Sequence, residues 1–461
     1  MHTDTIAAIA TAAGPGGIGI VRVSGPAAHD ILEHLFRPAS GRSVEKDATP
    51  WMLRRGMVVD DEGTPLDDAL AVFMPAPRTF TGEDVVEFQC HGGQVLLESV
   101  LEACLNAGAR QAERGEFTRR AFLNGRLDLT QAEAVAEMIA APSRQAARLA
   151  ATRLDGLLGR RIDALRERLE ELRARICLAV DFPEEEAECL PQDTFVEGIV
   201  SVKEAVSSLL AGFERSRCWR EGILVALAGP VNAGKSSLMN AFLGRERAIV
   251  TEYPGTTRDF LEEPVRFAGL PARLVDTAGL RDTDNPAEAR GIRMGRDMIA
   301  SADVVLLLID GTEGVTPASR ELLHDMGPDR TIIVWNKLDL ATPPDDWYET
   351  LLPSGGQAVV SARTGEGLEE LAASIRRLAL QRTQGREPEP DEAAPNLRQA
   401  RSLEQVRDEL TALVDDVRSG IPYDLCAVRL ESAAAVMAEI TGLDTPDDVL
   451  NRIFASFCIG K

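Results

Sequence analysis

The chain has 461 residues, of which 44% are hydrophobic and 27% are charged, and its formal net charge at pH 7 is -23. This length exceeds what one hydrophobic core usually supports, so we expect about three domains. The negative charge opposes nucleic-acid binding through bulk electrostatics, and no apolar run approaches the roughly 18 residues that span a bilayer.

The N-terminus and the cysteines both favour an intracellular protein. The first residues lack a basic stretch followed by an apolar one, so we expect no secretory signal and a cytoplasmic location without membrane partners. The seven cysteines are odd in number and never form a C-x-x-C pair, which argues against a disulfide framework or a zinc site. We expect most of them to be buried as small apolar residues.

The periodicity of apolar residues divides the chain into four segments. Short β-type runs, Gly/Pro turns and an apolar helix near 94–107 predict an α+β domain over residues 1–126. Leucine and isoleucine at helical spacing predict the first part of an all-α domain over 127–220. Residues 221–380 alternate short apolar strands with helix-length segments, which is typical of a parallel sheet covered on both faces.

The last segment, residues 381–461, begins with a polar stretch over 384–391 that we expect to be a linker, too charged and proline-rich to pack. Helical periodicity resumes at Asn396 and is expected to run to the C-terminus, forming the second part of the helical domain. The predicted fold class is therefore a multidomain chain, with an α/β domain inserted into an all-α domain that follows an N-terminal α+β domain.

A glycine-rich loop follows the first strand of the inserted domain. Residues 229–236 fit G-x-x-x-x-G-K-[ST], and a helix is expected to begin at Lys235. Backbone amides of such a loop close round phosphates, Lys235 reaches the outer phosphates, and the Ser236 hydroxyl can bind magnesium. The alternative, an ordinary glycine-rich turn, is weakened by the strand before the loop and the helix after it.

Three further motifs follow in the order that phosphoryl transfer requires. Residues 251–259 offer a hydroxyl, Thr257, as a second magnesium ligand, and the D-x-x-G at 276–279 follows a predicted strand. The N-K-x-D at 336–339 provides Asp339, whose carboxylate can accept both N1–H and the exocyclic amine of guanine, which adenine does not offer. The predicted cofactors are GTP and Mg²⁺, and the GTP-binding residues are Asn232, Ala233, Gly234, Lys235, Ser236, Ser237, Thr251, Thr256, Thr257, Asp276, Thr277, Ala278, Gly279, Asn336, Lys337, Asp339, Ser361, Ala362 and Arg363.

The whole chain resembles the MnmE (TrmE) family of tRNA-modification GTPases, among the TrmE-Era-EngA-like P-loop GTPases. The motifs that carry the resemblance are the loop with Asn232, the G-T-T-R-D switch, the C-terminal F-C-I-G-K, and residues 14–22, 81–84, 87–93, 115–124 and 181–185. The resemblance implies a homodimer that works with a flavoprotein partner of the MnmG type, in a heterotetramer, on the wobble uridine of tRNA. The product would carry an aminomethyl-type group, such as carboxymethylaminomethyl, on C5 of that uridine.

The resemblance also implies further ligands. A 5-formyl- or methylene-tetrahydrofolate would supply the one-carbon unit, bound by the N-terminal α+β domain through Arg22, Glu87 and Arg126, with Lys461 reaching across from the C-terminus. A potassium ion, held by Asn232 with oxygens of Thr251, Tyr253 and Thr256, would take the place of an arginine finger. Leu280 stands where Ras-type GTPases place a glutamine, and the family position Glu288 would instead orient the attacking water.

Two residues have open interpretations. Cys458, near Lys461, is a candidate nucleophile with a lowered pKa, and the alternative is an inert buried thiol in a C-terminal helix. His91 is a candidate base, and the alternative is a structural hydrogen bond at a turn.

Two other functions compete with tRNA modification. A ribosome-assembly GTPase would share the nucleotide motifs, although rRNA binders usually carry a basic domain. A folate-dependent aminomethyl transferase with a regulatory GTPase insert would share the N-terminal motifs.

Overall fold

The computed structural model describes residues 4–41, 49–181, 191–246, 262–276, 298–347, 355–389 and 391–460. Its contacts divide the chain into two compact units. The first contains Met1–Ala136, Arg153–Val202 and Asp408–Lys461, and the second contains Glu137–Thr152 and Lys203–Arg407. The four domain bounds expected from the sequence remain a prediction. None of the described helices is long and apolar enough to cross a membrane.

The first unit contains a seven-stranded sheet in the order β3-β4-β5-β6-β2-β1-β7, as the sequence predicted for an α+β domain. All neighbouring strands are antiparallel except β1 and β7. The strands are β1 (Ile6–Ile9), β2 (Gly16–Ser24), β3 (Phe36–Pro38), β4 (Arg54–Val59), β5 (Pro65–Met74), β6 (Val85–Gly92) and β7 (Arg110–Gln111).

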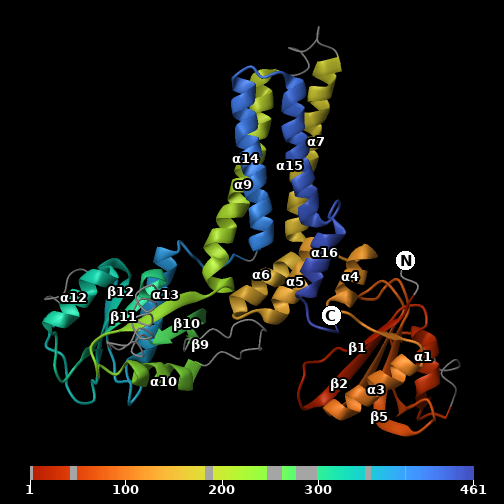
Figure 1. Cartoon of the computed structure of the whole chain (residues 1–461), viewed down its shortest axis with the longest axis horizontal. Helices are drawn as coiled ribbons and strands as arrows, with labels where there is room; N and C mark the ends of the chain where they lie inside the picture. The colour runs from red at the N-terminus through yellow and green to blue at the C-terminus, as the bar shows by residue number, and fades with distance from the viewer. Residues whose placement is uncertain are drawn as a thin grey trace, which may run out of the picture. The chain divides into compact units, whose positions relative to one another are not determined.

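Two helices, α1 (Ala28–Leu35) and α3 (Gln94–Asn106), pack on one face of this sheet (Figure 1). Strand residues alternate between the two faces, so Val21 and Val23 join the buried cluster beneath these helices. Arg22, between them, belongs to the opposite face. Part of that face is covered by α4 (Glu116–Leu123), whose Phe117 packs with Ile6 and Ala8.

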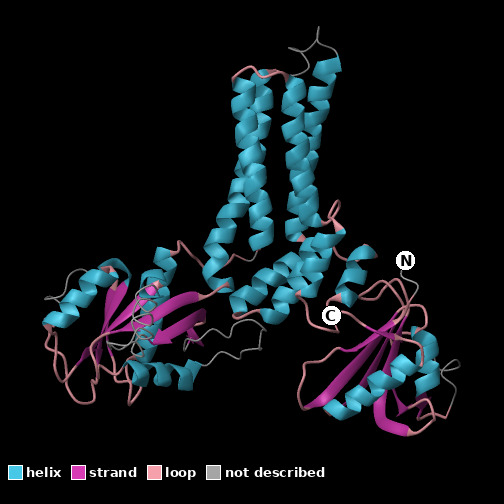
Figure 2. Ribbon diagram, in the orientation of Figure 1, coloured by secondary structure: helices cyan, strands magenta, loops and turns pink. Residues whose placement is uncertain are grey.

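The helical segment of the first unit confirms the predicted all-α domain, and its long helices are visible in Figure 2. Helix α7 packs along α15, with the leucines and isoleucines at helical spacing buried between them. The helices are α5 (Leu129–Ala140), α7 (Leu157–Asp181), α9 (Gln192–Arg220), α14 (Leu397–Arg418), α15 (Tyr423–Thr441) and α16 (Asp447–Ala455), of which α5, α9 and α14 contribute to both units. The expectation of helix to the C-terminus is wrong, because α16 ends at Ala455 and residues 456–460 form a non-helical tail.

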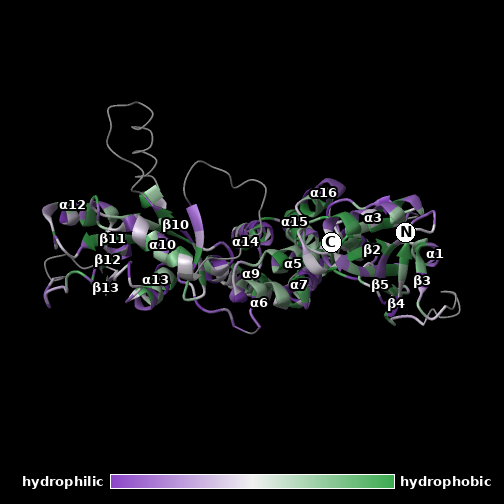
Figure 3. Cartoon of the chain, turned by 90° about the horizontal axis from the view of Figure 1, so that it is seen from below, coloured by the Kyte–Doolittle hydropathy of each residue, from purple (hydrophilic) through white to green (hydrophobic). Residues whose placement is uncertain are grey.

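The second unit contains a six-stranded sheet in the order β13-β12-β11-β8-β10-β9, parallel except for β9 at the edge. Strand β11 is hydrophobic from Val304 to Ile309 (Figure 3), and alternate residues enter buried clusters on the two faces. This arrangement is the predicted inserted α/β domain. Its elements are β8 (Ile223–Ala228), α10 (Lys235–Glu246), β9 (Glu262–Phe267), β10 (Leu270–Asp276), β11 (Val304–Asp310), α12 (Pro317–Met326), β12 (Thr331–Asn336), β13 (Gly356–Val359) and α13 (Leu368–Arg382), and α6 (Arg144–Leu154) begins in this unit.

The polar stretch after α13 packs, contrary to the expectation for residues 384–391. The Trp219 indole donates a hydrogen bond of 2.7 Å to the Arg386 carbonyl, and Pro388 is buried. Glu387 forms an ion pair with Arg376 of α13. The stretch therefore lies against α9 and α13 through hydrogen bonds and ion pairs, which hydropathy alone does not reveal.

Candidate functional site

The glycine-rich loop lies between β8 and α10, at the carboxyl edge of the parallel strands. Gly234 has φ +93°, and a Cβ there would stand 2.2 Å from the Asn336 amide nitrogen, so only glycine fits. Asn232 also has a left-handed φ of +66°, which asparagine tolerates better than most residues. The loop thus presents its backbone amides at the N-terminus of α10, where the helix dipole favours an anion.

Lys235, the first residue of α10, points back into this loop. Its ammonium donates hydrogen bonds of 2.7 Å to the carbonyls of Gly229 and Pro230, and the side chain is 8% exposed. Burial lowers the pKa of Lys235, although the carboxylate of Asp276 acts against this. A phosphate at the loop would give the buried cation a stronger partner than two neutral carbonyls.

The structure brings Ser236 together with Asp276, the last residue of β10. The Ser236 hydroxyl donates a hydrogen bond of 2.8 Å to the Asp276 carboxylate. Both groups are oxygen ligands of the kind that Mg²⁺ prefers. Ser237 follows on the exposed first turn of α10.

Asn336, at the end of β12, connects the loop to the predicted base-binding segment. Its amide donates 2.9 Å to the Ala233 carbonyl, and its side-chain oxygen accepts 3.1 Å from the Ala362 backbone N–H. With 1% exposure, the side chain is held on both sides and fixes the distance between phosphate loop and base segment.

Asp339 lies beside this bridge. Its carboxylate accepts a hydrogen bond of 2.6 Å from the Ser361 hydroxyl and forms an ion pair of 2.6 Å with Arg363. The hydroxyl and the guanidinium lower the pKa of Asp339, so it is an anionic acceptor at neutral pH. Arg363 is 73% exposed and can leave without disturbing a packed core.

Asp310 was not anticipated from the sequence. This last residue of β11 forms an ion pair of 2.6 Å with Lys337, whose φ of +66° directs the chain across the sheet edge. The sequence did contain a signal for Asp310. It is a carboxylate at the end of an apolar parallel strand, and such strands end at the same edge as the glycine-rich loop.

In the first unit, Arg22 and Glu87 form an ion pair of 2.8 Å across the neighbouring strands β2 and β6. The Arg22 guanidinium carbon lies 5.7 Å from the centre of the Phe117 ring, and both charged side chains remain partly exposed. Arg126 donates a hydrogen bond of 3.1 Å to the Thr79 carbonyl.

The C-terminal tail contacts the N-terminal sheet of the same unit. The Gly115 N–H donates 3.3 Å to the Cys458 carbonyl, and Ile459 forms a β-bridge with Arg114. Gly460 lies against Ile9, whose partner on β2 is next to Arg22. Cys458 is exposed and follows the end of α16, so the alternative of a buried thiol in a helix is wrong.

Four of the other described cysteines are buried, and His91 is paired with an aspartate. Cys90, Cys104, Cys218 and Cys426 are buried, and burial raises the pKa of Cys90 to about 12. Cys177 is exposed. The Nδ1 atom of His91 lies 2.7 Å from an Asp67 carboxylate oxygen, so the expected hydrogen bond is present, but His91 makes it within β6 and not at a turn.

Several predicted residues lie outside the described part of the chain. They are Thr251, Tyr253, Thr256, Thr257, Thr277, Ala278, Gly279, Glu288 and Lys461.

Two family models match the chain. One, described as the MnmE helical domain, matches residues 129–458, and the other, described as the GTP-binding protein TrmE N-terminus, matches residues 5–126. Relatives that match the full length of the chain carry the name tRNA modification GTPase MnmE. That of Nitratidesulfovibrio vulgaris (strain DP4) is 56% identical over 461 residues, covering 100% of both chains. That of Lawsonia intracellularis is 56% identical, covering 99% of this chain and 100% of the relative, and that of Geobacter sulfurreducens is 44% identical, covering 99% of both.

Two solved structures resemble part of the chain. The G domain of the T. maritima FeoB iron transporter is 31% identical, covers 34% of this chain and 98% of that chain, and has a TM-score of 0.26. A single-residue variant of Aquifex aeolicus Era bound to GDP.AlF4- is 25% identical, covers 41% of this chain and 67% of that chain, and has a TM-score of 0.29.

Proposed function

This chain belongs to the MnmE family of tRNA modification GTPases, and from that premise we propose that it hydrolyses GTP in the modification of the wobble uridine of tRNA. The observation that carries the proposal is the Asn336 bridge, because one buried amide ties the glycine-rich loop to the segment that would hold the base. In this arrangement the phosphate groups lie at the loop, and the guanine edge meets Asp339.

Asp339 provides the selectivity for guanine. Its lowered pKa keeps it ionised, and the carboxylate accepts N1–H and the exocyclic amine of guanine after Arg363 moves aside. The Ser361 hydroxyl holds one carboxylate oxygen in place while the base binds. Adenine offers no matching pair of donors, so ATP leaves a charged acceptor unpaired.

The residues of the phosphate end fit a magnesium ion. Ser236 and Asp276 supply two oxygens within 2.8 Å of one another, and Thr257 is proposed as the further ligand. When bound, Mg²⁺ neutralises charge on the phosphate oxygens. Lys235 turns from its loop carbonyls to the outer phosphates, and the amides of the loop hold the remaining oxygens.

Hydrolysis also needs an oriented water and a second positive charge. We assign the water to Glu288, and a potassium ion to Asn232 with Thr251, Tyr253 and Thr256. Asn232 fits this role because its left-handed backbone places it on the exposed outer side of the loop. A monovalent cation there would stabilise the charge that develops between the phosphates, as an arginine does in other GTPases.

The uncovered part of the N-terminal sheet face is the proposed folate site. Arg22 suits the glutamyl carboxylates of 5-formyl- or methylene-tetrahydrofolate, and Glu87 suits its amino-pterin ring. The tail that carries Cys458 and ends at Lys461 reaches this sheet at Ile9, one strand from Arg22. Arg126 would contribute from the loop that holds it at Thr79. The folate supplies a one-carbon unit, and these residues hold and orient it.

The proposed assembly is a cytoplasmic homodimer that joins a flavoprotein partner of the MnmG type in a heterotetramer. Trp51, Met52 and Leu53 are each at least 50% exposed and follow one another beside β5, whose Phe73 carbonyl accepts from the Trp51 N–H. Large apolar side chains grouped on a surface favour a protein interface. Because the chain is strongly acidic, we assign most of the contact with the tRNA phosphate backbone to the partner.

Two measurements test this function. Purified protein should hydrolyse GTP and not ATP, and Asp339→Asn should shift preference toward xanthosine triphosphate, because an amide offers a donor to the xanthine carbonyl. Unchanged GTP selectivity in the variant would refute the base assignment. Mass spectrometry of tRNA from cells that lack the protein should show wobble uridines without the C5 group, and a normal modification pattern would favour a ribosome-assembly role.

A further inference from the structure

The hairpin formed by β9 and β10 joins two segments of the proposed nucleotide site. β9 begins at Glu262, three positions after residue 259, and β10 ends at Asp276 beside Ser236. The two strands are paired continuously from Val275–Glu262 to Leu270–Phe267, so the hairpin moves as one body. A displacement at its nucleotide end therefore reaches the turn at Ala268 and Gly269.

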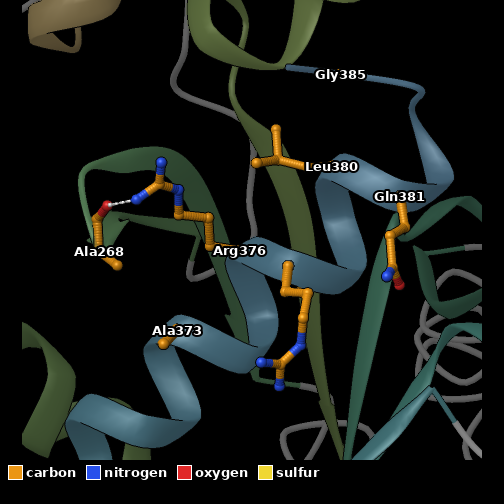
Figure 4. Close-up of a pocket in the computed structure, with 7 residues that line it drawn as sticks. Ala268, Ala373, Arg376, Leu380, Gln381 and Gly385 are labelled. Atoms are coloured by element: carbon orange, nitrogen blue, oxygen red, sulfur yellow. Dashed lines mark hydrogen bonds between the residues drawn. The ribbon is translucent and has the colours of Figure 1, made fainter. Parts of the chain in front are cut away.

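The turn end of the hairpin is bound to two other elements of the second unit. Arg266 donates 2.9 Å to the Pro142 carbonyl, in the loop between α5 and α6. At the turn itself, the Ala268 carbonyl accepts 3.3 Å from the guanidinium of Arg376 on α13 (Figure 4).

Arg376 links the hairpin to both places where the chain passes between helical segment and α/β domain. Its guanidinium carbon lies 5.5 Å from the centre of the Trp219 ring, at the end of α9. The same group forms an ion pair with Glu387, in the stretch that follows α13. One side chain thus contacts the hairpin turn, the segment before β8 and the segment after α13.

Trp219 connects the contacts made by Arg376 with those made by Arg266. It is fully buried, its indole donates to the Arg386 carbonyl, and its own carbonyl accepts 3.2 Å from the Ser143 hydroxyl. Ser143 is adjacent to Pro142, which Arg266 binds. The hairpin therefore reaches Trp219 by two arms, one through Arg266 and the other through Arg376.

The turn has room to move against α13. An open groove of about 480 Å³ lies beside the Ala268–Arg376 hydrogen bond, lined by Ala373 and Leu380 of α13 and by Gly385 (Figure 4). Movement into a groove does not require the repacking that a close-packed core would impose. Ser143 and Trp219, where the two arms meet, are buried, so displacement of the turn is passed on to Trp219.

We propose that the β9–β10 hairpin transmits the nucleotide state to the base of the helical segment. Arg266 and Arg376 couple the movement of the hairpin to Trp219, which passes it to the segments on either side of the α/β domain. The inference rests on the proposed GTPase function. It requires that the triphosphate state favour one hairpin position by differential contact, since only such contact shifts an equilibrium between two positions. The movement would reach α9 and residues 384–389 together, because Trp219 holds both.

The test uses the full chain labelled with 5-fluorotryptophan and observed by ¹⁹F NMR. The Trp219 resonance is assigned by its loss in Trp219→Phe. Between GDP and GDP with aluminium fluoride, in potassium buffer, this resonance should shift in the wild type. Trp51, in the other unit, should not shift through this route and provides an internal reference.

The variants distinguish residues that transmit the movement from residues that only stabilise the fold. Arg376→Met keeps an unbranched side chain on the Trp219 ring but loses both polar partners, and it should reduce the Trp219 shift at least fivefold. Arg377→Met is the matched control, because Arg377 also lines the groove but, within the described part of the chain, its guanidinium donates its hydrogen bond to Ser374 of its own helix. Arg266→Met cuts the second arm and should reduce the shift independently. Thermal unfolding of each variant checks that the fold is retained.

The outcomes are distinguishable. If nucleotide binds and the Trp219 resonance of the wild type does not shift, the coupling is overturned and the proposed function stands. The same conclusion follows if the resonance shifts as far in the Arg376→Met and Arg266→Met proteins as it does in the wild type. If the wild-type protein binds no guanine nucleotide, by a fluorescent-analogue titration, the proposed function fails and the coupling fails with it.

Discussion

Replacing Gly460 by alanine tests whether the position of the C-terminal tail matters for the chemistry. Gly460 has φ +89°, and an added Cβ would stand 2.3 Å from the Ile9 carbonyl oxygen and 3.0 Å from the Ala10 Cα. Ile9 belongs to β1 and is paired with Val21, so this backbone cannot retreat without disturbing the sheet. The tail must therefore leave its place beside the strand.

Docking the altered tail costs more free energy than docking the native one. A left-handed backbone costs a residue with a Cβ roughly 1–2 kcal/mol, before any clash is counted. The tail is held by the 3.3 Å hydrogen bond from the Gly115 N–H to the Cys458 carbonyl and by the β-bridge between Ile459 and Arg114, and one such hydrogen bond contributes about 0.5–1.5 kcal/mol. Because each 1.4 kcal/mol is a factor of ten, we expect the docked population to fall by about tenfold or more.

The assay compares tRNA modification with GTP hydrolysis in the reconstituted system. Gly460→Ala should lower the modification rate by about tenfold or more and leave hydrolysis within about twofold, since Phe457 stays buried and anchors the preceding chain. Gly420→Ala is the matched control, because Gly420 has φ +75° with no heavy atom within 4 Å of an added Cβ. Equal modification rates in the two variants would refute the reasoning.

Three further predictions concern the cation, the water and one surface histidine. Potassium should stimulate hydrolysis well beyond sodium, and Asn232→Ala should abolish the difference; equal wild-type rates in the two salts would remove the cation from the mechanism. Glu288→Ala should preserve pairing of the nucleotide-binding domains with GDP and aluminium fluoride, followed by spin-label distances, while nearly eliminating turnover; wild-type tRNA modification in that variant would separate hydrolysis from the chemistry. The hydrogen bond and charge of Asp67 raise the pKa of His91, so the pair stabilises the fold below the ordinary histidine pKa, and this contribution is lost as pH rises through the raised value. An NMR titration should show the raised pKa of His91 return toward about 6.5 in Asp67→Asn, and no change would contradict the assigned cause.

The fold of the α/β domain was predictable because its rules are local. A strand, a glycine-rich loop and a helix follow one another over 223–246, and the carboxyl ends of parallel strands meet at one edge. The N-K-x-D segment begins at the end of a parallel strand and so lies at the edge where the loop lies, although the buried bridge through Asn336 could not be foreseen. That bridge depends on side-chain hydrogen bonds of Asn336 to Ala233, 103 positions away, and to Ala362, 26 positions away.

Other features depended on contacts that no local pattern contains. The pairing of Arg22 with Glu87 follows from the register of two antiparallel strands, which are 65 positions apart. The tail after α16 is not helical, because its backbone at Cys458 and Ile459 pairs with Gly115 and Arg114, which are far away in the sequence. The stretch after α13 packs because its charges find partners on α13 and its carbonyl finds the Trp219 indole, so composition alone misjudged it.

The hydrogen bond from Trp219 to Arg386 also bears on how such a chain could arise. The segment that enters the α/β domain and the segment that leaves it are joined at this bond, although 167 positions separate them. A domain whose two ends already lie together can be placed within a host chain with little loop-closure entropy, and the host need not stretch to accept it. The contact therefore makes the α/β domain a module that recombination could exchange as one piece, while the surrounding helices keep their own order.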